Sequence, residues 1–214
     1  MSTFAKALFY RYDIVIAHDI DEYLVVDPNQ NQSLADYLQR PVRTASISAL
    51  GLDVGQHLEK EQAIDSSKPF LEQREFAQVS ARYTKPIVAN KPITWGSGFH
   101  RVKGRNFRID PNLYLFHFGM VDFEKSSKKI GSPALSKAGW AGHLERRNQL
   151  FDTITRGNAV DGDDFLFEIC MDLNQEGRLE IYDLSHEGQP MAIDRFLRKL
   201  CESQPQVVEV VNCD

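Results

Sequence analysis

Three acidic residues lie close together near the N-terminus, and their spacing suits metal chemistry. Asp19, Asp21 and Glu22 follow directly after the short apolar run of residues 14–17. Side chains alternate along an extended chain, so Asp19 and Asp21 would point to one face and repel each other. A divalent cation removes that repulsion, and carboxylate oxygens suit Mg2+ or Mn2+. The spacing therefore predicts a metal site at Asp19 and Asp21, and the structural alternative is a strand end with solvated acids.

The elements that would position these acids are short strands and helices. The apolar, β-branched run before the acids predicts a buried strand, whose carboxyl end is where α/β sheets bind ligands. Further strands are expected at residues 45–50, 85–89, 113–118 and 179–184, a glycine-containing loop at 51–57, and helices at 3–12, 33–38, 135–156 and 193–200. This order predicts a single α/β domain with a mixed central sheet and flanking helices. Residues 1–120 would form the motif-bearing core, and residues 121–214 would be mostly helical.

The composition is that of an ordinary globular chain with an acidic balance. The chain has 214 residues, a net charge of -5 and 42% hydrophobic residues, which is enough for a packed core. A nucleic-acid surface would need a basic excess, so nucleic acid is not expected as a partner. No apolar run is long enough for a transmembrane segment, and the N-terminus lacks a signal-peptide pattern. The three cysteines have no metal-type spacing and fit a reducing, cytoplasmic location.

Four segments of the chain, residues 12–24, 85–88, 98–100 and 113–118, occur in an order that resembles the C-terminal half of GT-A-type glycosyltransferases. The closest resemblance is to glycosyltransferase family 2 and related bacterial sugar transferases with an Asp-x-Asp-Glu-(Phe/Tyr) signature. It implies a metal-dependent transferase that moves a sugar from a nucleotide-diphosphate donor to a hydroxyl acceptor, such as a glycan or a lipid-linked sugar. Asp19 and Asp21, with Glu22 beside them, would hold the cation and the donor diphosphate.

The resemblance also implies that a later histidine completes the metal site. His117 ends the strand expected at 113–118 and is the first choice, and His100 is the alternative. Imidazole is a better ligand for Mn2+ than for Mg2+. The structural alternative for either residue is a partly buried histidine that is hydrogen-bonded to backbone.

Sugar transfer from such a donor needs a cation near the leaving phosphate and a base near the acceptor. Lys85 and Arg101 are the expected sources of the cation, and Trp95 is the expected aromatic contact with the donor. An inverting transfer needs a carboxylate to take the proton of the acceptor hydroxyl. The candidates for that base are Glu72, Glu75 and Asp53. The structural alternatives are that Lys85 is a solvated lysine at a strand start and that Trp95 is a core residue.

One departure from the family pattern concerns the chain before the acids. GT-A enzymes carry a βαβ half there that binds the base and ribose of the nucleotide, whereas only residues 1–13 precede the expected strand here. An incomplete sheet exposes an edge, so we expect self-association or a partner that supplies the missing half. The expected location is the cytoplasm, including the inner membrane surface. Two alternative functions are a non-catalytic remnant or subunit and a metal-dependent phosphoester hydrolase.

Overall fold

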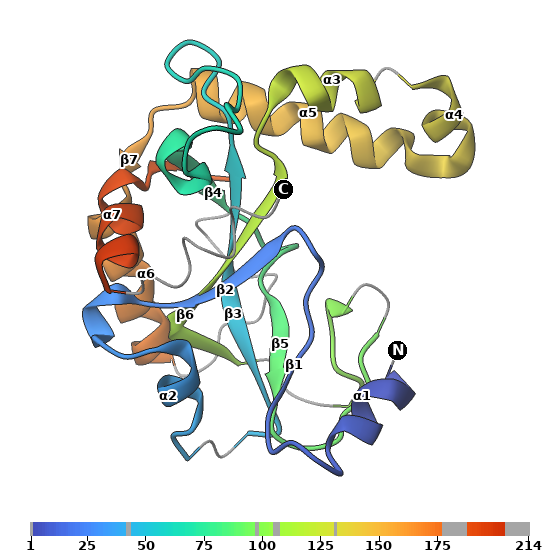
Figure 1. The fold of residues 1–214 in the computed structure, drawn as a ribbon, viewed down its shortest axis with the longest axis vertical. Helices are drawn as coiled ribbons and strands as arrows, with labels where there is room; N and C mark the ends of the chain where they lie inside the picture. The colour runs from blue at the N-terminus through green and yellow to red at the C-terminus, as the bar shows by residue number, and fades with distance from the viewer. Residues whose placement is uncertain are drawn as a thin grey trace. The chain divides into compact units, whose positions relative to one another are not determined.

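The computed structural model describes residues 2–41, 44–96, 99–104, 108–130, 132–176 and 188–203 (Figure 1). The chain divides into two compact units that interleave in the sequence. The first unit comprises Met1–Leu52, Val79–His117 and Leu166–Glu187, and the second comprises Asp53–Gln78, Phe118–Phe165 and Gly188–Asp214.

The first unit contains the strands that position the acidic motif. Strand β5 (Lys85–Ala89) lies between β1 (Val15–Ile16) and β3 (Ser46–Gly55), and β6 (Ile109–Met120) pairs with both β2 (Glu22–Val26) and β3. The pairs β1–β5, β2–β6 and β3–β5 are antiparallel. Strands β3 and β6 continue into the second unit.

The second unit adds a parallel pair, which makes the sheet mixed. Strand β8 (Pro190–Ala192) pairs antiparallel with β4 (Phe76–Val79) and parallel with β7 (Val160–Asp161). The predicted class, α/β with a mixed sheet and flanking helices, is therefore confirmed.

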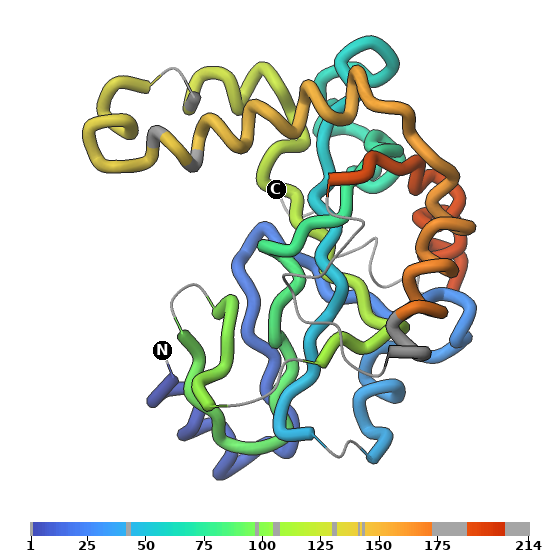
Figure 2. The backbone as a smooth tube through the Cα atoms, turned by 180° about the vertical axis from the view of Figure 1, so that it is seen from behind, coloured from blue at the N-terminus to red at the C-terminus, as the bar shows by residue number. Residues whose placement is uncertain are grey.

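Two short helices pack on the sheet of the first unit. Helix α1 (Ser2–Leu8) lies beside the segment around Trp95 in both views (Figures 1 and 2), and its Ala5 shares a core cluster with Val15 and Trp95. Helix α2 (Leu34–Leu38) is capped by the Ser33 hydroxyl, which accepts the Asp36 N–H, as a helix at 33–38 predicts. The sequence expectation for the first helix was too long, because α1 ends at Leu8.

The helices of the second unit follow the expected helical C-terminal segments in part. They are α3 (Phe123–Ile130), α4 (Pro133–Leu135), α5 (Ala141–Arg156) and α7 (Asp194–Ser203), and α6 (Gly162–Glu176) starts here and continues into the first unit. Figure 1 shows α3 alongside α5. The single helix predicted at 135–156 is wrong, because Gly139 adopts a positive φ of 85° and breaks it. No helix of the described ranges is long and apolar enough for a membrane span.

Strand β3 corrects the loop predicted at residues 51–57. The strand continues through Gly51 to Gly55, since its apolar residues are buried there. The chain around Tyr83 passes close to Gly51, because a Cβ on Gly51 would meet the carbonyl carbon of Tyr83 at 2.2 Å. The strand predicted at 179–184 lies outside the described residues.

Candidate functional site

The acidic motif forms a tight turn between β1 and β2 instead of the end of one strand. The Glu22 N–H donates to the Asp19 carbonyl at 3.1 Å and closes a four-residue turn with Ile20 and Asp21 at its tip. The prediction that strand alternation puts Asp19 and Asp21 on one face is therefore wrong. Aspartate is favoured at the first position of such turns, and β1 ends two residues before the motif. The two carboxylates consequently reach different partners.

The Asp19 carboxylate reaches the buried ammonium of Lys85. The Lys85 side chain is 1% exposed, and its Nζ donates to Asp19 Oδ2 at 3.2 Å. The register of β1 and β5 explains this contact. Val15 faces Ala89 and Ile16 faces Val88, and the same register continued past the strand brings Asp19 opposite Lys85.

Glu22 anchors both the turn and the lysine. Its buried carboxylate accepts the Asp19 N–H on Oε2 at 2.9 Å, and Oε1 lies 2.7 Å from Lys85 Nζ. The contact between Lys85 Nζ and Glu22 Oε1 is an ion pair, and its angles are not those of a hydrogen bond. A buried charge pair is costly to break, because the remaining charge has lost its hydration. Glu22 and Lys85 therefore fix the position of Asp19, which is 55% exposed.

The Asp21 carboxylate reaches a histidine on strand β6. His117 Nε2 lies 3.5 Å from Asp21 Oδ2, and the imidazole stacks on the ring of Tyr83 with centroids 3.7 Å apart. The β2–β6 register brings the two segments together, because Glu22 faces His117 directly. His117 is buried, whereas Asp21 is 40% exposed. Donor atoms from two distant parts of the chain thus meet at the surface of the first unit.

The pair of Asp21 and His117 fits part of a divalent-cation site. Neighbouring ligands on an octahedral Mg2+ lie about 3 Å apart, close to the observed separation of their donor atoms. Among the residues that the structure describes, no three His, Cys, Asp or Glu side chains are placed to hold a metal ion. Such ions are often held by one or two protein ligands together with substrate phosphates, so two donors suit a site that the ligand completes.

His100, the alternative ligand, is fixed by backbone. Its Nδ1 donates to the Arg82 carbonyl at 2.8 Å, which leaves Nε2 as the acceptor of the neutral ring. Burial lowers the pKa of His100, the hydrogen bond to Arg82 opposes this, and the charges of Lys85, Arg82 and Arg101 lower it further. The structural alternative, a histidine bonded to backbone, is therefore confirmed for His100. Arg101 lies beside it, and its Nη1 donates to the His100 carbonyl at 2.5 Å.

Two of the expected donor contacts have interior positions. Trp95 is a core residue that packs with Val15 and Ala89, and its Nε1 donates to the Pro86 carbonyl at 2.8 Å. Its indole therefore serves the fold, as the structural alternative states. Lys85 is not the solvated lysine of that alternative, because it lies beneath Asp19 and is held by two carboxylates. It is placed to act through Asp19 and Glu22.

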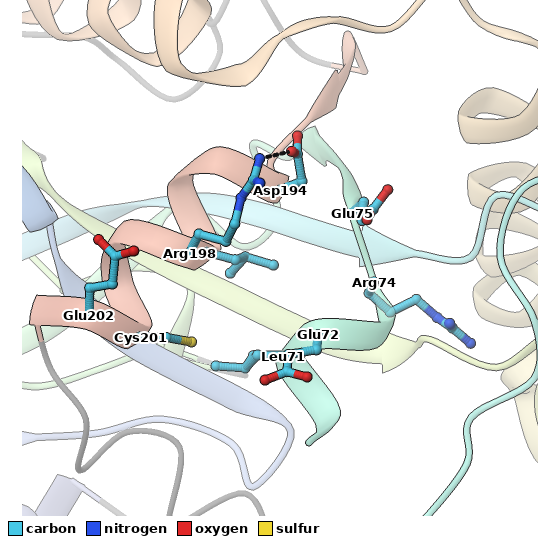
Figure 3. A pocket seen from close by; sticks show the side chains of 9 residues that line it. Leu71, Glu72, Arg74, Glu75, Asp194, Arg198, Cys201 and Glu202 are labelled. Carbon is cyan, nitrogen blue, oxygen red and sulfur yellow. Dashed lines mark hydrogen bonds and ion pairs between the residues drawn. The ribbon is translucent and has the colours of Figure 1, made fainter. Parts of the chain in front are cut away.

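The three candidate bases belong to the second unit, and the acidic turn belongs to the first. Glu72 and Glu75 line a cavity of about 440 Å3 together with Asp194 and Cys201 (Figure 3). Burial raises the pKa of the Cys201 thiol, and the nearby charges of Glu72 and Glu202 raise it further. The cavity is also lined by Glu202 and by two basic residues, Arg74 and Arg198. The third candidate, Asp53, lies in β3.

Sequence reasoning missed Tyr83 and the anchoring role of Glu22. Tyr83 supports His117 by stacking, and Glu22 ties Lys85 to the turn. Tyr83 belongs to no sequence motif, and only the pairing of distant strands places it next to His117. Comparisons of the chain with protein-family models, with curated proteins and with solved structures found no match.

Proposed function

We propose that the chain is a metal-dependent glycosyltransferase, or the catalytic part of one, that moves a sugar from a nucleotide-diphosphate donor to a hydroxyl acceptor. The observation that carries this proposal is the meeting of Asp21 and His117 beside the Asp19–Lys85–Glu22 cluster. The exposed carboxylate of Asp19, the partly exposed carboxylate of Asp21 and Nε2 of the buried His117 lie close together, and such a set can share a cation with a diphosphate. The residues that resemble the GT-A signature are the same residues that come together.

The cation would be held by Asp21 and His117, with Asp19 close to the donor. A bound Mn2+ or Mg2+ would neutralise negative charge on the leaving diphosphate. Lys85 and Glu22 would keep Asp19 in a fixed position, so that little reorganisation is needed when the donor binds. Tyr83 would hold the His117 ring in one orientation through its stacking contact. Arg101 is the second expected cation for the donor.

The transfer itself breaks the bond between the sugar carbon and the leaving phosphate oxygen, which keeps the electron pair. The acceptor hydroxyl oxygen forms the new bond to that carbon and gives up its proton to a carboxylate in an inverting transfer. Our candidates for this proton acceptor are Asp53, Glu72 and Glu75. Replacing each by the matching amide should identify the base as the variant that loses turnover and keeps donor binding.

Calorimetric titration with uridine diphosphate and guanosine diphosphate, with and without Mn2+, tests the proposal. We expect binding of at least one nucleotide that requires Mn2+. Asp21→Ala should reduce that affinity by at least about tenfold, which corresponds to about 1.4 kcal/mol. The fold should survive, because Asp21 lies at the tip of an exposed turn and surface substitutions have small effects.

The matched control for this titration is Asp36→Ala, which removes an exposed carboxylate of the first unit in helix α2. Asp36→Ala should leave nucleotide affinity unchanged within about twofold. A folded wild-type chain that binds neither nucleotide, or an Asp21→Ala variant with unchanged binding, would contradict the metal-site proposal.

A subunit that needs a partner is the second candidate function. Strand β1 is the last strand on one side of the sheet order, and Ile20 at the tip of the acidic turn is almost fully exposed. An exposed edge next to an apolar side chain favours pairing with another chain. Sedimentation velocity of the purified chain would distinguish a self-associating chain from a monomer whose partner is a different polypeptide.

A further inference from the structure

A cavity in the first unit lies away from the acidic turn. Its volume is about 590 Å3, within the range of about 300–1,000 Å3 that small-ligand sites span. The cavity lies where the segment after α1 leads into β1, and residues 38–40, Asn90 and Pro92 line it as well. The acidic turn follows the other end of β1, so the cavity and the candidate metal site are separate.

Aromatic and apolar side chains form one part of the cavity lining. Phe9 and Tyr12 contribute rings, and Ile14 and the buried Leu38 contribute aliphatic surface. Tyr12 is 61% exposed, although it belongs to the lining. The negative face of an aromatic ring attracts polarised C–H groups, which is how such rings bind the apolar face of a sugar. An exposed ring at a cavity is therefore a suitable platform for one sugar unit.

The charges around the cavity argue against an anionic ligand. The Arg40 guanidinium pairs with the buried carboxylate of Asp110 and lies 3.8 Å over the ring of Tyr37. Tyr37 in turn donates its hydroxyl to Asp110 at 2.8 Å, so this arrangement is fixed. The positive charge of Arg40 is thus balanced by Asp110, and Asp13 adds a negative charge to the lining. A phosphate would lack the excess of positive charge that it requires.

Neutral polar groups complete the lining. Gln39 and Asn90 carry amides, each of which offers both donors and an acceptor, and Asp13 offers acceptors. Hydroxyl groups of a sugar both donate and accept, so they match this mixture. An apolar platform combined with balanced charges and amides indicates a ligand that is neutral and rich in hydroxyls.

We propose that this cavity binds a neutral oligosaccharide, with one sugar ring on Tyr12, hydrogen bonds between its hydroxyls and the amides of Gln39 and Asn90, and hydroxyls that donate to the Asp13 carboxylate. Its role as a subsite for the acceptor glycan rests on the proposed transferase function. The cavity and the acidic turn lie at opposite ends of β1, up to about 20 Å apart along the chain. An acceptor that occupies both places is therefore an oligosaccharide and not a single sugar.

Titration of the chain with maltotriose, cellotriose and N-acetylchitotriose, followed by saturation-transfer NMR and calorimetry, tests the site. We expect at least one trisaccharide to bind. Tyr12→Ala should weaken that binding by at least about tenfold, whereas Tyr12→Phe should keep it within about twofold, because the ring remains. Tyr10→Ala is the matched control, since Tyr10 is 91% exposed and does not line the cavity.

The proposal is overturned if none of the three trisaccharides binds, or if binding is the same in Tyr12→Ala and wild type. Displacement of the sugar by inorganic phosphate would overturn the argument from charge. The nucleotide titration separates this site from the proposed function. Mn2+-dependent nucleotide binding should be the same in Tyr12→Ala and wild type, so either activity can fail while the other holds.

Discussion

Among the residues that the structure describes, each unit has a buried cation beside two carboxylates, and the two arrangements differ in the partners and exposure of these carboxylates. In the first unit Lys85 contacts Glu22 and Asp19. In the second unit the buried Arg74 lies near Glu61 and Asp122, and its Nε and Nη1 donate to the carbonyls of Val121 and Gln73.

The carboxylates near Arg74 accept hydrogen bonds from backbone N–H groups. Glu61 accepts the N–H groups of His57 and Glu75, both at 2.6 Å, and the buried Asp122 accepts those of Ile64 and Lys125. Each of these four oxygens has a backbone donor, so this cluster joins chain segments and has a structural role. Arg74 is also one of the residues that line the cavity of Glu72 and Cys201 (Figure 3).

The two carboxylates that contact Lys85 differ in their exposure to solvent. Glu22 is buried, whereas the side chain of Asp19 is 55% exposed and that of Asp21 is 40% exposed. The buried cation therefore holds a carboxylate that a ligand can reach. In the second unit backbone N–H groups donate to both carboxylates. In the first unit a backbone N–H donates to the buried Glu22, and the exposed carboxylate of Asp19 contacts Lys85.

Removal of Arg74 should have the largest effect on stability. Arg74→Met takes the donors from the two carbonyls and removes the buried cation near Glu61 and Asp122. We expect the free energy of unfolding to fall by about 4 kcal/mol, because Asp122 is buried and Glu61 and the two carbonyls are partly buried. Urea denaturation followed by circular dichroism measures this loss.

Arg198→Met is the matched control for Arg74. Arg198 is exposed and pairs with Asp194 within one helix, so its removal should cost less than about 0.5 kcal/mol. Equal losses in the two variants would show that Arg74 is not the centre of a structural cluster.

Lys85→Met should come next, with a loss of about 3 kcal/mol. The loss is smaller than for Arg74, because Asp19 can return to solvent and only Glu22 remains as a buried charge. A second substitution, Glu22→Leu, should restore much of the stability by removing that charge. The double variant should still bind nucleotide more weakly than wild type, since Asp19 has lost its support. Full stability of Lys85→Met would mean that Lys85 and Glu22 do not form a buried ion pair in solution.

The sequence predicted several elements well where the pattern was local. Strand β5 occupies residues 85–89 as expected, and α2 follows its Ser33 cap. The sequence grouped the acidic motif with Lys85 and His117 as candidate site residues, and both lie beside the motif in the structure. The strand-end geometry was wrong, because a two-residue strand followed by a turn has the same apolar-then-acidic pattern as one longer strand.

What the sequence did not give depends on pairing between distant segments. The burial of Lys85 follows from the β1–β5 register, and the meeting of Asp21 with His117 follows from the β2–β6 register. Neither register can be deduced from residue spacing within one segment. The same reason explains why Trp95 was expected at the donor and lies in the core instead.

His117 and His100 should differ in their effect on the metal site. His117→Gln should weaken Mn2+ affinity by about tenfold, or about 1.4 kcal/mol, whereas His100→Gln should change it by less than about threefold. The reason is that His117 Nε2 lies beside Asp21, whereas His100 is bound to the Arg82 backbone. Mn2+ titration followed by electron paramagnetic resonance measures both. The reverse order of effects would reassign the imidazole ligand to His100.

The smallest expected effect is a pH dependence in the second unit. Burial lowers the pKa of His57, and the charge of Lys60 lowers it further. His57 Nδ1 is buried and has no hydrogen-bond partner among the described residues, which agrees with a neutral ring. When the pH falls below 6.5, the unfolded chain takes up a proton at His57 before the folded chain does, so acid favours unfolding.

Urea unfolding at pH 7.5 and pH 5.5 should therefore show a larger loss of stability in wild type than in His57→Gln. His100 acts in the same direction, because its pKa is also lowered, and Glu61 acts in the opposite direction, because burial raises its pKa. Both groups are present in the wild type and the variant, so the difference between the two proteins isolates His57. If wild type and His57→Gln lose equal stability between the two pH values, the His57 imidazole is accessible to water. The cluster around Arg74 would then be more hydrated than its backbone hydrogen bonds indicate.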